Sequence, residues 1–460
     1  MATPKFRVES VADSGDAVIV ETTGARYLFE RGEMLRVSCY QRINTERLVA
    51  RLTLSIPGGT FLVEHDDAQQ VVLRQRTTDT WYTRLAVRAD SVLDVYSMTE
   101  IDVAVEGAFV PAYVAVKGPH AILADELGGV GCYGVRGMAL EAGGIYTTAQ
   151  WEHAYRGERF SRLWVSVFPP RPFELERSLN DRIAHWGVNP PWTFGHYPSD
   201  AMIAEAAPYA NILVLHDQIW HGQRTVRGLP METTEHLLAD AAYCSYDWVP
   251  ADEAELRRVV RTAHDHGMRV LPYQSPTFTM APIEHLLGET ARLLEDYGFD
   301  GVYYDGLTFD LVQAYDLMRK ARALLGERLL YLHTTYEPFG SREVIAPFLD
   351  TYADFVLRGE HPSDFAEEAY IRYVLCSQST SHAIAHVCHC YYPPEFVESI
   401  LDTVLANEGR FYLALPQTEN ETVLKRHYYP RLDERRRDHM LDSGANWSIT
   451  NDEVLHAETG

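Results

Sequence analysis

Short runs of alternating apolar residues make up the first third of the chain. They lie at residues 17–21, 35–40, 71–74, 85–88 and 112–116, with Gly and Asp turns between them. Alternation with a period of two is typical of half-buried β-strands, and no stretch of ten or more residues holds a helical period. The pattern predicts an antiparallel β-sandwich over residues 1–167.

A proline-rich segment then ends this pattern. The sequence from Phe168 to Phe173 contains three prolines, each of which fixes φ and removes an amide donor. We place the domain boundary here. The pattern predicts a linker over 168–189 that contains a short helix over 174–186.

Further along the chain, apolar strands alternate with amphipathic helices. Eight candidate strands lie at 193–197, 212–216, 269–273, 301–305, 329–333, 354–358, 382–386 and 410–414, with helices at 252–266, 282–297, 311–325 and 394–408. Eight such units predict a (β/α)8 TIM barrel over 190–430, followed by a charged tail over 431–460. A doubly wound sheet is the alternative, but no glycine-rich phosphate loop follows any strand.

Composition and charge narrow the function classes. With 460 residues, 46% of them hydrophobic, the chain is large enough for two or three folding units. Its formal charge of -24 would repel nucleic acid and anionic membrane surfaces, so neither is an expected partner. We find no signal-peptide pattern and no run of about 18 apolar residues, and we expect a cytoplasmic protein. The sequence leaves a homo-oligomer open.

The six cysteines are scattered, as expected for reduced core thiols rather than a disulfide framework. One local cluster, from His386 to Cys390, holds two histidines and two cysteines. A single apolar strand cannot wrap four ligands around a tetrahedral metal ion. We therefore expect no metal and no other cofactor.

Polar side chains recur at the predicted C-terminal ends of the barrel strands. Those expected to contact a substrate are His196, His216, Asp217, Gln274, Tyr304, His333, Arg358 and His386. The C-terminal ends of parallel strands meet at the barrel mouth, where enzymes of this fold hold their active sites. Each buried polar group left unpaired costs about 1 to 3 kcal/mol, so a polar pocket explains the pattern better than core packing.

Two acids are the candidates for chemistry. Asp305 ends the fourth predicted strand and Glu360 follows the sixth. Strands two apart can place carboxylates within the roughly 5 to 10 Å that glycoside hydrolysis needs. Arg358 lies two residues before Glu360, so it would either hold that acid ionised or clamp an anionic substrate group. The structural alternatives are that Asp305 caps the next helix and that Glu360 pairs with Arg358 at the barrel rim.

This order of elements, with an aspartate at strand four and an acid at strand six, resembles glycoside hydrolase clan D and the alpha-glucosidase superfamily, which includes the alpha-galactosidases. The resemblance implies a retaining glycosidase acting on small oligosaccharides or glycosides, with Asp305 as nucleophile and Glu360 as acid/base. The chain departs from the clan in having Tyr303 where a lysine is typical and a glutamate at position 360. It also has no evident room for a C-terminal β-domain after Arg431.

The segment between Asp217 and Pro250 is unusually aromatic for a loop. It contains Trp220, His221, Tyr243, Tyr246 and Trp248. Sugar rings pack on aromatic faces, so we expect this loop to form part of a carbohydrate-binding wall, with Trp220 in contact with the sugar. The alternative is that these rings only anchor the loop to the barrel.

Three other functions remain open. A polysaccharide lyase or sugar epimerase could use Tyr304, His333 and Arg358 as base and charge clamp at the same mouth. A metal-dependent barrel hydrolase could draw ligands from the histidines and acids, but the chain lacks the paired histidines on strand one typical of amidohydrolases. A sugar-binding protein on an inactive barrel would keep the aromatics without needing both acids.

Overall fold

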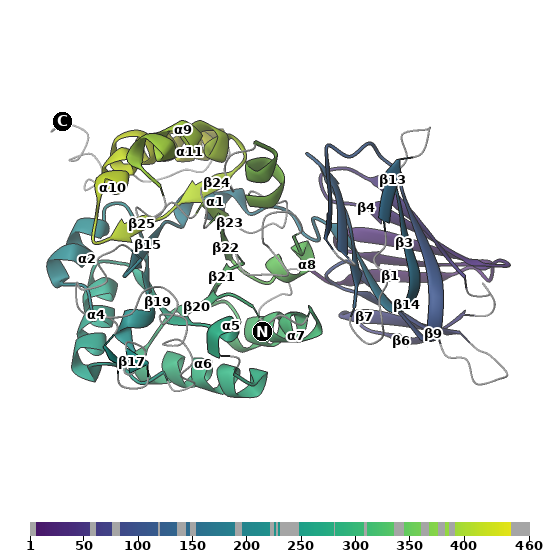
Figure 1. The fold of residues 1–460 in the computed structure, drawn as a ribbon, viewed down its shortest axis with the longest axis horizontal. Helices are drawn as coiled ribbons and strands as arrows, with labels where there is room; N and C mark the ends of the chain where they lie inside the picture. Colours follow the sequence, from purple (N-terminus) through teal and green to yellow (C-terminus); the bar gives the residue numbers. More distant parts are fainter. Residues whose placement is uncertain are drawn as a thin grey trace.

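The computed structural model describes residues 6–55, 61–75, 83–117, 120–135, 144–147, 153–188, 196–220, 225–226, 229–230, 248–279, 281–307, 311–334, 345–359, 368–375, 382–385 and 392–442. Figure 1 shows two parts side by side, an N-terminal antiparallel β part and a C-terminal part in which helices surround a curved parallel sheet. This order confirms the predicted succession of antiparallel strands and then parallel strands with helices.

The antiparallel part contains one continuous sheet that bends over its own core. Its strands are β1 Val8–Asp13, β2 Ala17–Thr22, β3 Ala25–Glu30, β4 Leu35–Gln41, β5 Arg47–Leu54, β6 Phe61–Asp66, β7 Gln70–Gln75, β8 Thr83–Arg88, β9 Val92–Gly107, β10 Tyr113–Lys117, β11 His120–Asp125, β12 Gly128–Gly134, β13 Gly144–Thr147 and β14 His153–Phe168. In β2 the buried positions alternate with half-buried ones, as the sequence pattern predicts. The valines and leucines on the inner faces form one apolar core.

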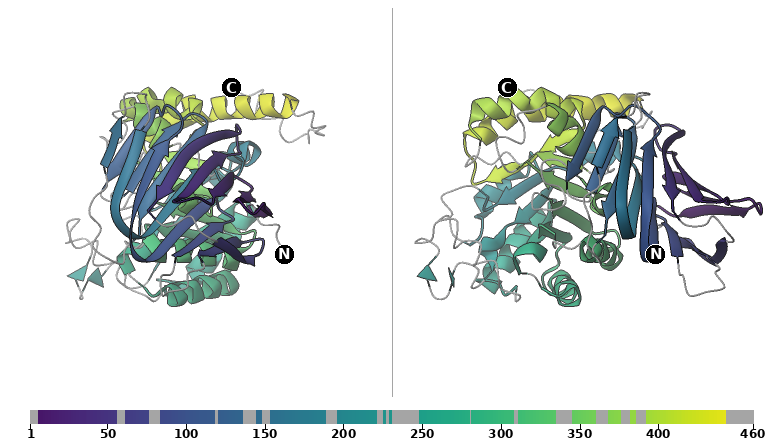
Figure 2. Two further views of the ribbon diagram at one scale, coloured as in Figure 1. Left: turned by 90° about the vertical axis from the view of Figure 1, so that its right-hand side faces the viewer. Right: turned by 45° about the vertical axis from the view of Figure 1, so that its right-hand side comes forward.

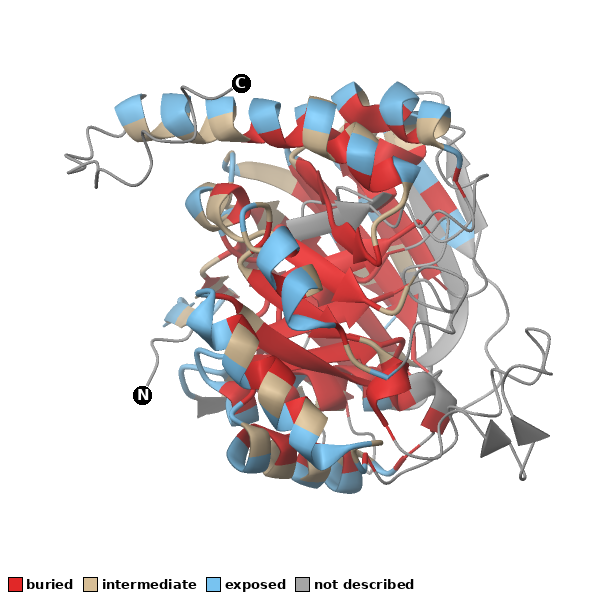
Figure 3. Ribbon diagram, turned by 90° about the vertical axis from the view of Figure 1, so that its left-hand side faces the viewer, coloured by how far each residue is buried: buried red, intermediate tan, exposed pale blue. Residues whose placement is uncertain are grey.

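The parallel sheet has the strand order β24-β23-β22-β21-β20-β19-β16-β15-β25. Its strands are β15 Ile183–Trp186, β16 Ile212–Leu215, β19 Arg269–Gln274, β20 Gly301–Asp305, β21 Leu329–His333, β22 Phe355–Arg358, β23 His382–Ala385, β24 Gly409–Phe411 and β25 Leu413–Leu415. The strands β15, β16, β19 to β22, β24 and β25 are buried, whereas the surrounding helices expose their outer faces (Figure 3). A separate two-stranded ribbon joins β17 Thr225–Val226 to β18 Leu229–Pro230.

Helices and helical turns connect and follow these strands. They are α1 Leu175–Asn180, α2 Asp200–Ala206, η1 Asp217–Ile219, α4 Glu253–Asp265, α5 Pro276–Thr279, α6 Ile283–Tyr297, α7 Leu311–Leu325, α8 Pro347–Asp350, η4 Tyr370–Leu375, α9 Pro394–Ala406, α10 Glu419–Val423, η5 Leu424–Tyr428 and α11 Tyr429–Asp442. In α6 the left-handed Gly298 ends the helix just before β20. Within the described residues, no helix is long and apolar enough to cross a bilayer.

The first parallel strand differs from the sequence prediction. The prediction placed it at 193–197 and treated 174–186 as a helical connector, whereas helix α1 ends at Asn180 and β15 follows at once. All four residues of β15 are buried, and the strand pairs with β16 and β25. Tertiary pairing on both edges overrides the helical pattern of so short a segment. Residues 189–195, which include most of the predicted strand, lie outside the described residues.

The two parts share a buried aromatic interface. In the left view of Figure 2 the antiparallel part lies in front of the parallel sheet and its helices. Phe348 of α8 packs 5.0 Å from the Tyr133 ring and 5.7 Å from the Trp164 ring, both of which lie in the antiparallel sheet. The Tyr133 hydroxyl donates to the carbonyl of Ile345 at 2.6 Å. Helix α8, which follows β21, is therefore fixed against the N-terminal part.

A carboxylate is buried in the same interface. Asp90, which follows β8, accepts hydrogen bonds from the hydroxyls of Tyr315 on α7 and Tyr352 just after α8. Burial raises the pKa of Asp90, and the neighbouring Arg88 guanidinium opposes that rise. The interface is thus polar at one point and aromatic around it.

We expect Phe348→Ala to lower the free energy of unfolding by about 3 to 5 kcal/mol, because it empties a buried aromatic site between the two parts. Chemical denaturation followed by fluorescence measures the change. The matched control is Leu441→Ala, since Leu441 is 79% exposed and its truncation should change stability by less than about 0.5 kcal/mol. Equal stability of both variants would show that α8 does not hold the interface.

Candidate active site

Asp305 lies at the C-terminal end of β20, on the inner side of the parallel sheet. Within β20 the side chains alternate: the Tyr303 ring meets the Tyr331 ring of β21 at 4.8 Å, whereas the Tyr304 hydroxyl contacts Thr290 of α6. Asp305 shares the side of Tyr303 because residues two apart in a strand point the same way. It is only 6% exposed.

Both neighbouring strands supply a hydrogen-bond donor to Asp305. His333 ends β21 and donates through Nδ1 to Oδ1 at 2.7 Å. Tyr273 of β19 donates its hydroxyl to Oδ2 at 3.0 Å. Burial alone would raise the pKa of Asp305, but the His333 hydrogen bond and charge, with contributions from His216 and Tyr273, lower it below its ordinary value. The carboxyl is therefore ionised at neutral pH.

A second pair of an acid and a histidine lies beside this group. His216 Nδ1 and Asp217 Oδ1 are 2.7 Å apart, directly after β16. The His216 ring packs 4.6 Å from the Tyr273 ring, which connects the two pairs through one aromatic side chain. Asp217 Oδ2 is buried and has no hydrogen-bond partner among the described residues. The site thus combines two carboxylates, two imidazoles and a phenol.

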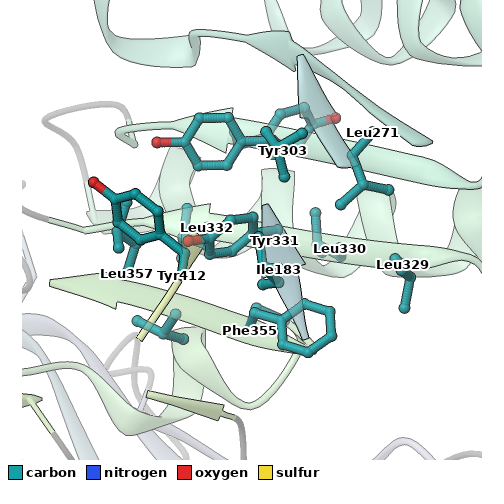
Figure 4. Packing of buried hydrophobic residues seen from close by; sticks show 14 of the residues in the cluster. Ile183, Leu271, Tyr303, Leu329, Leu330, Tyr331, Leu332, Phe355, Leu357 and Tyr412 are labelled. Atoms are coloured by element: carbon teal, nitrogen blue, oxygen red, sulfur yellow. The ribbon is translucent and has the colours of Figure 1, made fainter. Parts of the chain in front are cut away.

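Beneath Asp305, the interior of the sheet is filled by aromatic rings. In Figure 4 the hydroxyls of Tyr303, Tyr331 and Tyr412 point toward the end where Leu357 lies, away from Leu329. His185 of β15 packs 4.6 Å from the Tyr412 ring, and its Nε2 lies 3.1 Å from the Tyr331 hydroxyl. The charged groups of the site therefore lie next to a layer of buried aromatic side chains.

Sequence reasoning missed His185 and Tyr273. His185 was hidden because β15 lies in the segment predicted as a helical connector. Tyr273 is the last residue of the predicted strand, and Gln274, which follows it, was predicted as the substrate contact. The period of two supplies the missing signal, since Leu271 and Tyr273 alternate with Gln274 and only one set can face the interior.

Gln274 and Tyr304 do not join Asp305. Thr290 of α6 donates to Gln274 Oε1 at 2.7 Å, and its hydroxyl lies 3.1 Å from the Tyr304 hydroxyl. Both side chains are fully buried between the sheet and α6. The structure therefore separates these two predicted substrate contacts from the candidate site.

Arg358 is also turned away from the interior. Leu357 pairs with His333 in the register of β22 and β21, so Arg358 points to the opposite side. Its fully buried guanidinium binds Asp350 of α8, Thr334 Oγ1 at 3.0 Å and the carbonyl of Val374 at 2.9 Å. This ion pair replaces the predicted substrate clamp, because each of these partners holds the guanidinium inside the protein. Glu360 and His386 lie outside the described residues.

His196 and Trp220 are held by contacts with backbone groups. His196 Nδ1 lies 2.7 Å from the carbonyl of Gln218, and its own carbonyl accepts from Trp186 Nε1 at 3.1 Å. Trp220 is fully buried, and its indole donates to the carbonyl of Tyr273 at 2.9 Å. Trp248 is also fully buried at the other end of the aromatic segment. These contacts favour the anchoring interpretation for both tryptophans.

Across the part of the chain that the structure describes, no three His, Cys, Asp or Glu side chains form a group that could hold a metal ion. His216, Asp217, Asp305 and His333 are instead arranged as two hydrogen-bonded pairs. Their geometry suits proton transfer and charge stabilisation.

Comparisons with known proteins give distant structural similarity. The chain matches no protein-family model and no curated protein. Similar solved structures include a chitinase from Bacteroides thetaiotaomicron (10% identity, 59% of this chain and 99% of that one, TM-score 0.36). A maltogenic alpha-amylase AmyB from Thermotoga neapolitana has 13% identity over 57% of this chain and 77% of that one, with a TM-score of 0.35. Alpha-L-fucosidase AlfC from Lactobacillus casei has 13% identity over 57% and 98%, with a TM-score of 0.32.

We expect Trp220→Ala to lower the melting temperature while leaving KM within about twofold in the folded fraction, because the indole is buried and bound to backbone. Removal of a buried tryptophan destabilises by about 3 to 5 kcal/mol. Differential scanning calorimetry with steady-state kinetics separates stability from binding. A tenfold rise in KM at an unchanged melting temperature would instead show that Trp220 contacts the substrate.

Proposed function

We propose that this protein is a glycoside hydrolase with Asp305 as its nucleophile. The observation that carries the proposal is a buried carboxylate at the end of a parallel strand, held by one donor from each neighbouring strand. These donors lower the pKa of the carboxyl. A retaining glycosidase needs such a group, because its nucleophile must stay charged and keep one orientation while it attacks.

We also propose that the parallel sheet is a complete (β/α)8 barrel. β24 and β25 are separated only by Tyr412, and they pair with β23 and β15 respectively. Counting them as two halves of one strand gives eight strands in a closed order. A helix follows each strand in the chain, and Asp305, His333 and His216 then lie at the C-terminal mouth, where barrel enzymes hold their active sites.

In the proposed mechanism, Asp305 attacks the anomeric carbon while Glu360 donates a proton to the departing glycosidic oxygen. The products of this step are a covalent glycosyl-enzyme and the free aglycone. Glu360, now a carboxylate, takes a proton from water, which attacks the same carbon and releases Asp305. Glu360 follows β22 by two residues, which favours its assignment to the same mouth.

The proposed substrates are small oligosaccharides or glycosides. The formal charge of -24 disfavours polyanionic substrates, because they would be repelled from the protein surface. A cytoplasmic location is part of the proposal. We also propose that His216 and Asp217 contact the sugar, since the unpartnered Asp217 Oδ2 is free to accept a hydrogen bond from a sugar hydroxyl.

A second candidate is a polysaccharide lyase or sugar epimerase. One observation favours it: Asp305 holds His333 through Nδ1, the arrangement in which a carboxylate orients a histidine base. In that case His333 would take a proton from a sugar carbon. Water labelled with oxygen-18 separates the candidates, because a hydrolase inserts one labelled oxygen at the anomeric carbon and a lyase or epimerase does not.

We expect Asp305→Asn and Glu360→Gln each to lower kcat by about a thousandfold or more, equal to roughly 4 kcal/mol, because each removes a charge or proton at nearly constant volume. The assay uses a panel of 4-nitrophenyl α- and β-glycosides. Tyr304→Phe is the matched control, since Tyr304 lies outside the candidate site. A variant that keeps more than about a tenth of wild-type activity overturns the role assigned to that residue.

Chemical rescue by azide distinguishes the two roles. In Asp305→Gly, azide should occupy the vacated face and attack the anomeric carbon, giving a glycosyl azide of inverted configuration. In Glu360→Gly, azide should replace water in the second step, giving retained configuration. Product NMR reads the anomer, and inversion in both variants would contradict the retaining mechanism.

We expect activity to survive prolonged EDTA treatment, because the proposed chemistry uses two carboxylates and no Lewis acid. Assays before and after dialysis measure this. Loss of activity that zinc or manganese restores would make a metal-dependent hydrolase the leading candidate.

A further inference from the structure

We propose that Tyr273 and His333 are positioning residues that act together through Asp305: each donates to a different carboxylate oxygen, which fixes the carboxylate plane and stabilises its negative charge. This inference deepens the proposed function and rests on it for its kinetic consequence. The hydrogen-bond geometry itself does not depend on the reaction assigned to the site.

The strand order places Asp305 between its two donors. β20 pairs with β19 on one side and with β21 on the other, so Tyr273 and His333 approach from opposite directions. An ionised carboxylate only accepts hydrogen bonds, so both partners must donate, the imidazole through Nδ1 and the phenol through its hydroxyl. Two donors on two oxygens restrain rotation about the bond between Cβ and Cγ, which a single donor would permit.

The donors are themselves held in place. Tyr273 packs against the His216 ring at 4.6 Å and the Tyr303 ring at 5.9 Å, and its carbonyl accepts from buried Trp220. His333 is 3% exposed, and the next residue, Thr334, accepts from Arg358. Rotation of either donor away from Asp305 would therefore disturb a packed neighbour.

The charged and titratable groups that face Asp305 determine the direction of the expected effect. The electrostatic partners of Asp305 include His333 and Tyr331 on β21, Tyr273 on β19 and His216 after β16. Burial opposes the charge, and the donors counteract burial. Loss of one donor should therefore raise the pKa of the Asp305 carboxyl. When the pH is lowered, activity that needs the ionised form should then be lost at a higher pH than in the wild type.

The test compares isosteric variants. Tyr273→Phe removes one donor and keeps the ring, whereas Tyr304→Phe removes a hydroxyl that does not contact Asp305. His333→Leu removes the second donor, and His333→Asn keeps an N–H near the position of Nδ1. Carbon-13 NMR of protein labelled at the aspartate carboxyl carbons, assigned by difference with Asp305→Asn, follows the Asp305 titration without any substrate.

We expect Tyr273→Phe and His333→Leu each to raise the Asp305 midpoint by about one pH unit or more, with His333→Asn closer to the wild type and Tyr304→Phe unchanged. In kinetics with a 4-nitrophenyl glycoside, the acidic limb of kcat/KM should move by the same amount, and kcat should fall more than KM rises. Thermal melting identifies any misfolded variant. If His333→Leu does not fold, the comparison of the Asp305 midpoint in Tyr273→Phe with that in Tyr304→Phe tests the proposal.

An unchanged Asp305 midpoint in Tyr273→Phe overturns the positioning proposal and leaves the glycosidase assignment untouched. Full activity of Asp305→Asn overturns the glycosidase assignment, while the NMR titration still tests the hydrogen-bond geometry. The two failures are thus distinguishable.

Discussion

The constraint on which the candidate site depends is the presence of a negative charge inside a nearly closed aromatic interior. Removing a carboxylate from water opposes its ionisation by several kcal/mol unless nearby donors replace the lost hydration. At Asp305 the replacement comes from Tyr273 and His333, on the strands at either side. The charge is stable only while three adjacent strands keep their register, so the parallel sheet and the candidate chemistry are parts of one arrangement.

The buried ion pair of Arg358 and Asp350 extends this dependence to the N-terminal part. Asp350 belongs to α8, whose Phe348 packs against Tyr133 and Trp164 of the antiparallel sheet. Arg358 in turn donates to Thr334, the residue after His333. Contacts therefore run without a gap from the domain interface to a donor of Asp305. A buried ion pair adds little net stability, but it restricts its partners to one geometry.

The sequence was informative where a strand was a clear apolar run and ambiguous where a strand was short. The strands around Val214, Leu271 and Tyr303 were predictable because each is apolar and preceded or followed by an amphipathic helix. β15 was not, since four residues directly after a short helix carry no period of their own. Only pairing with β16 and β25 makes it a strand.

The candidate site was predictable where a polar residue ends an apolar strand. A carboxylate at the end of an apolar strand is visible in the sequence, and so is a histidine at the end of the next one. Adjacent residues of a strand face opposite sides of the sheet, so the side chain that faces the carboxylate follows from the alternation. Tyr273 and Asp305 face the interior, whereas Gln274 and Tyr304 face α6. The partner of Arg358 could not be predicted, because Asp350 lies on a helix of four residues that only tertiary packing defines.

The hydrogen bonds of Asp90 bear on whether the two parts are interchangeable modules. One carboxylate oxygen from the antiparallel part accepts from Tyr315 and Tyr352, two tyrosines of the other part. If the parallel part were joined to a different partner, Tyr315 and Tyr352 would lose the acceptor that they share, and the antiparallel part alone would keep the Asp90 carboxylate without these two donors. Recombination at the proline-rich boundary should therefore be tolerated best when all three residues are kept, so we expect the two parts to be inherited together.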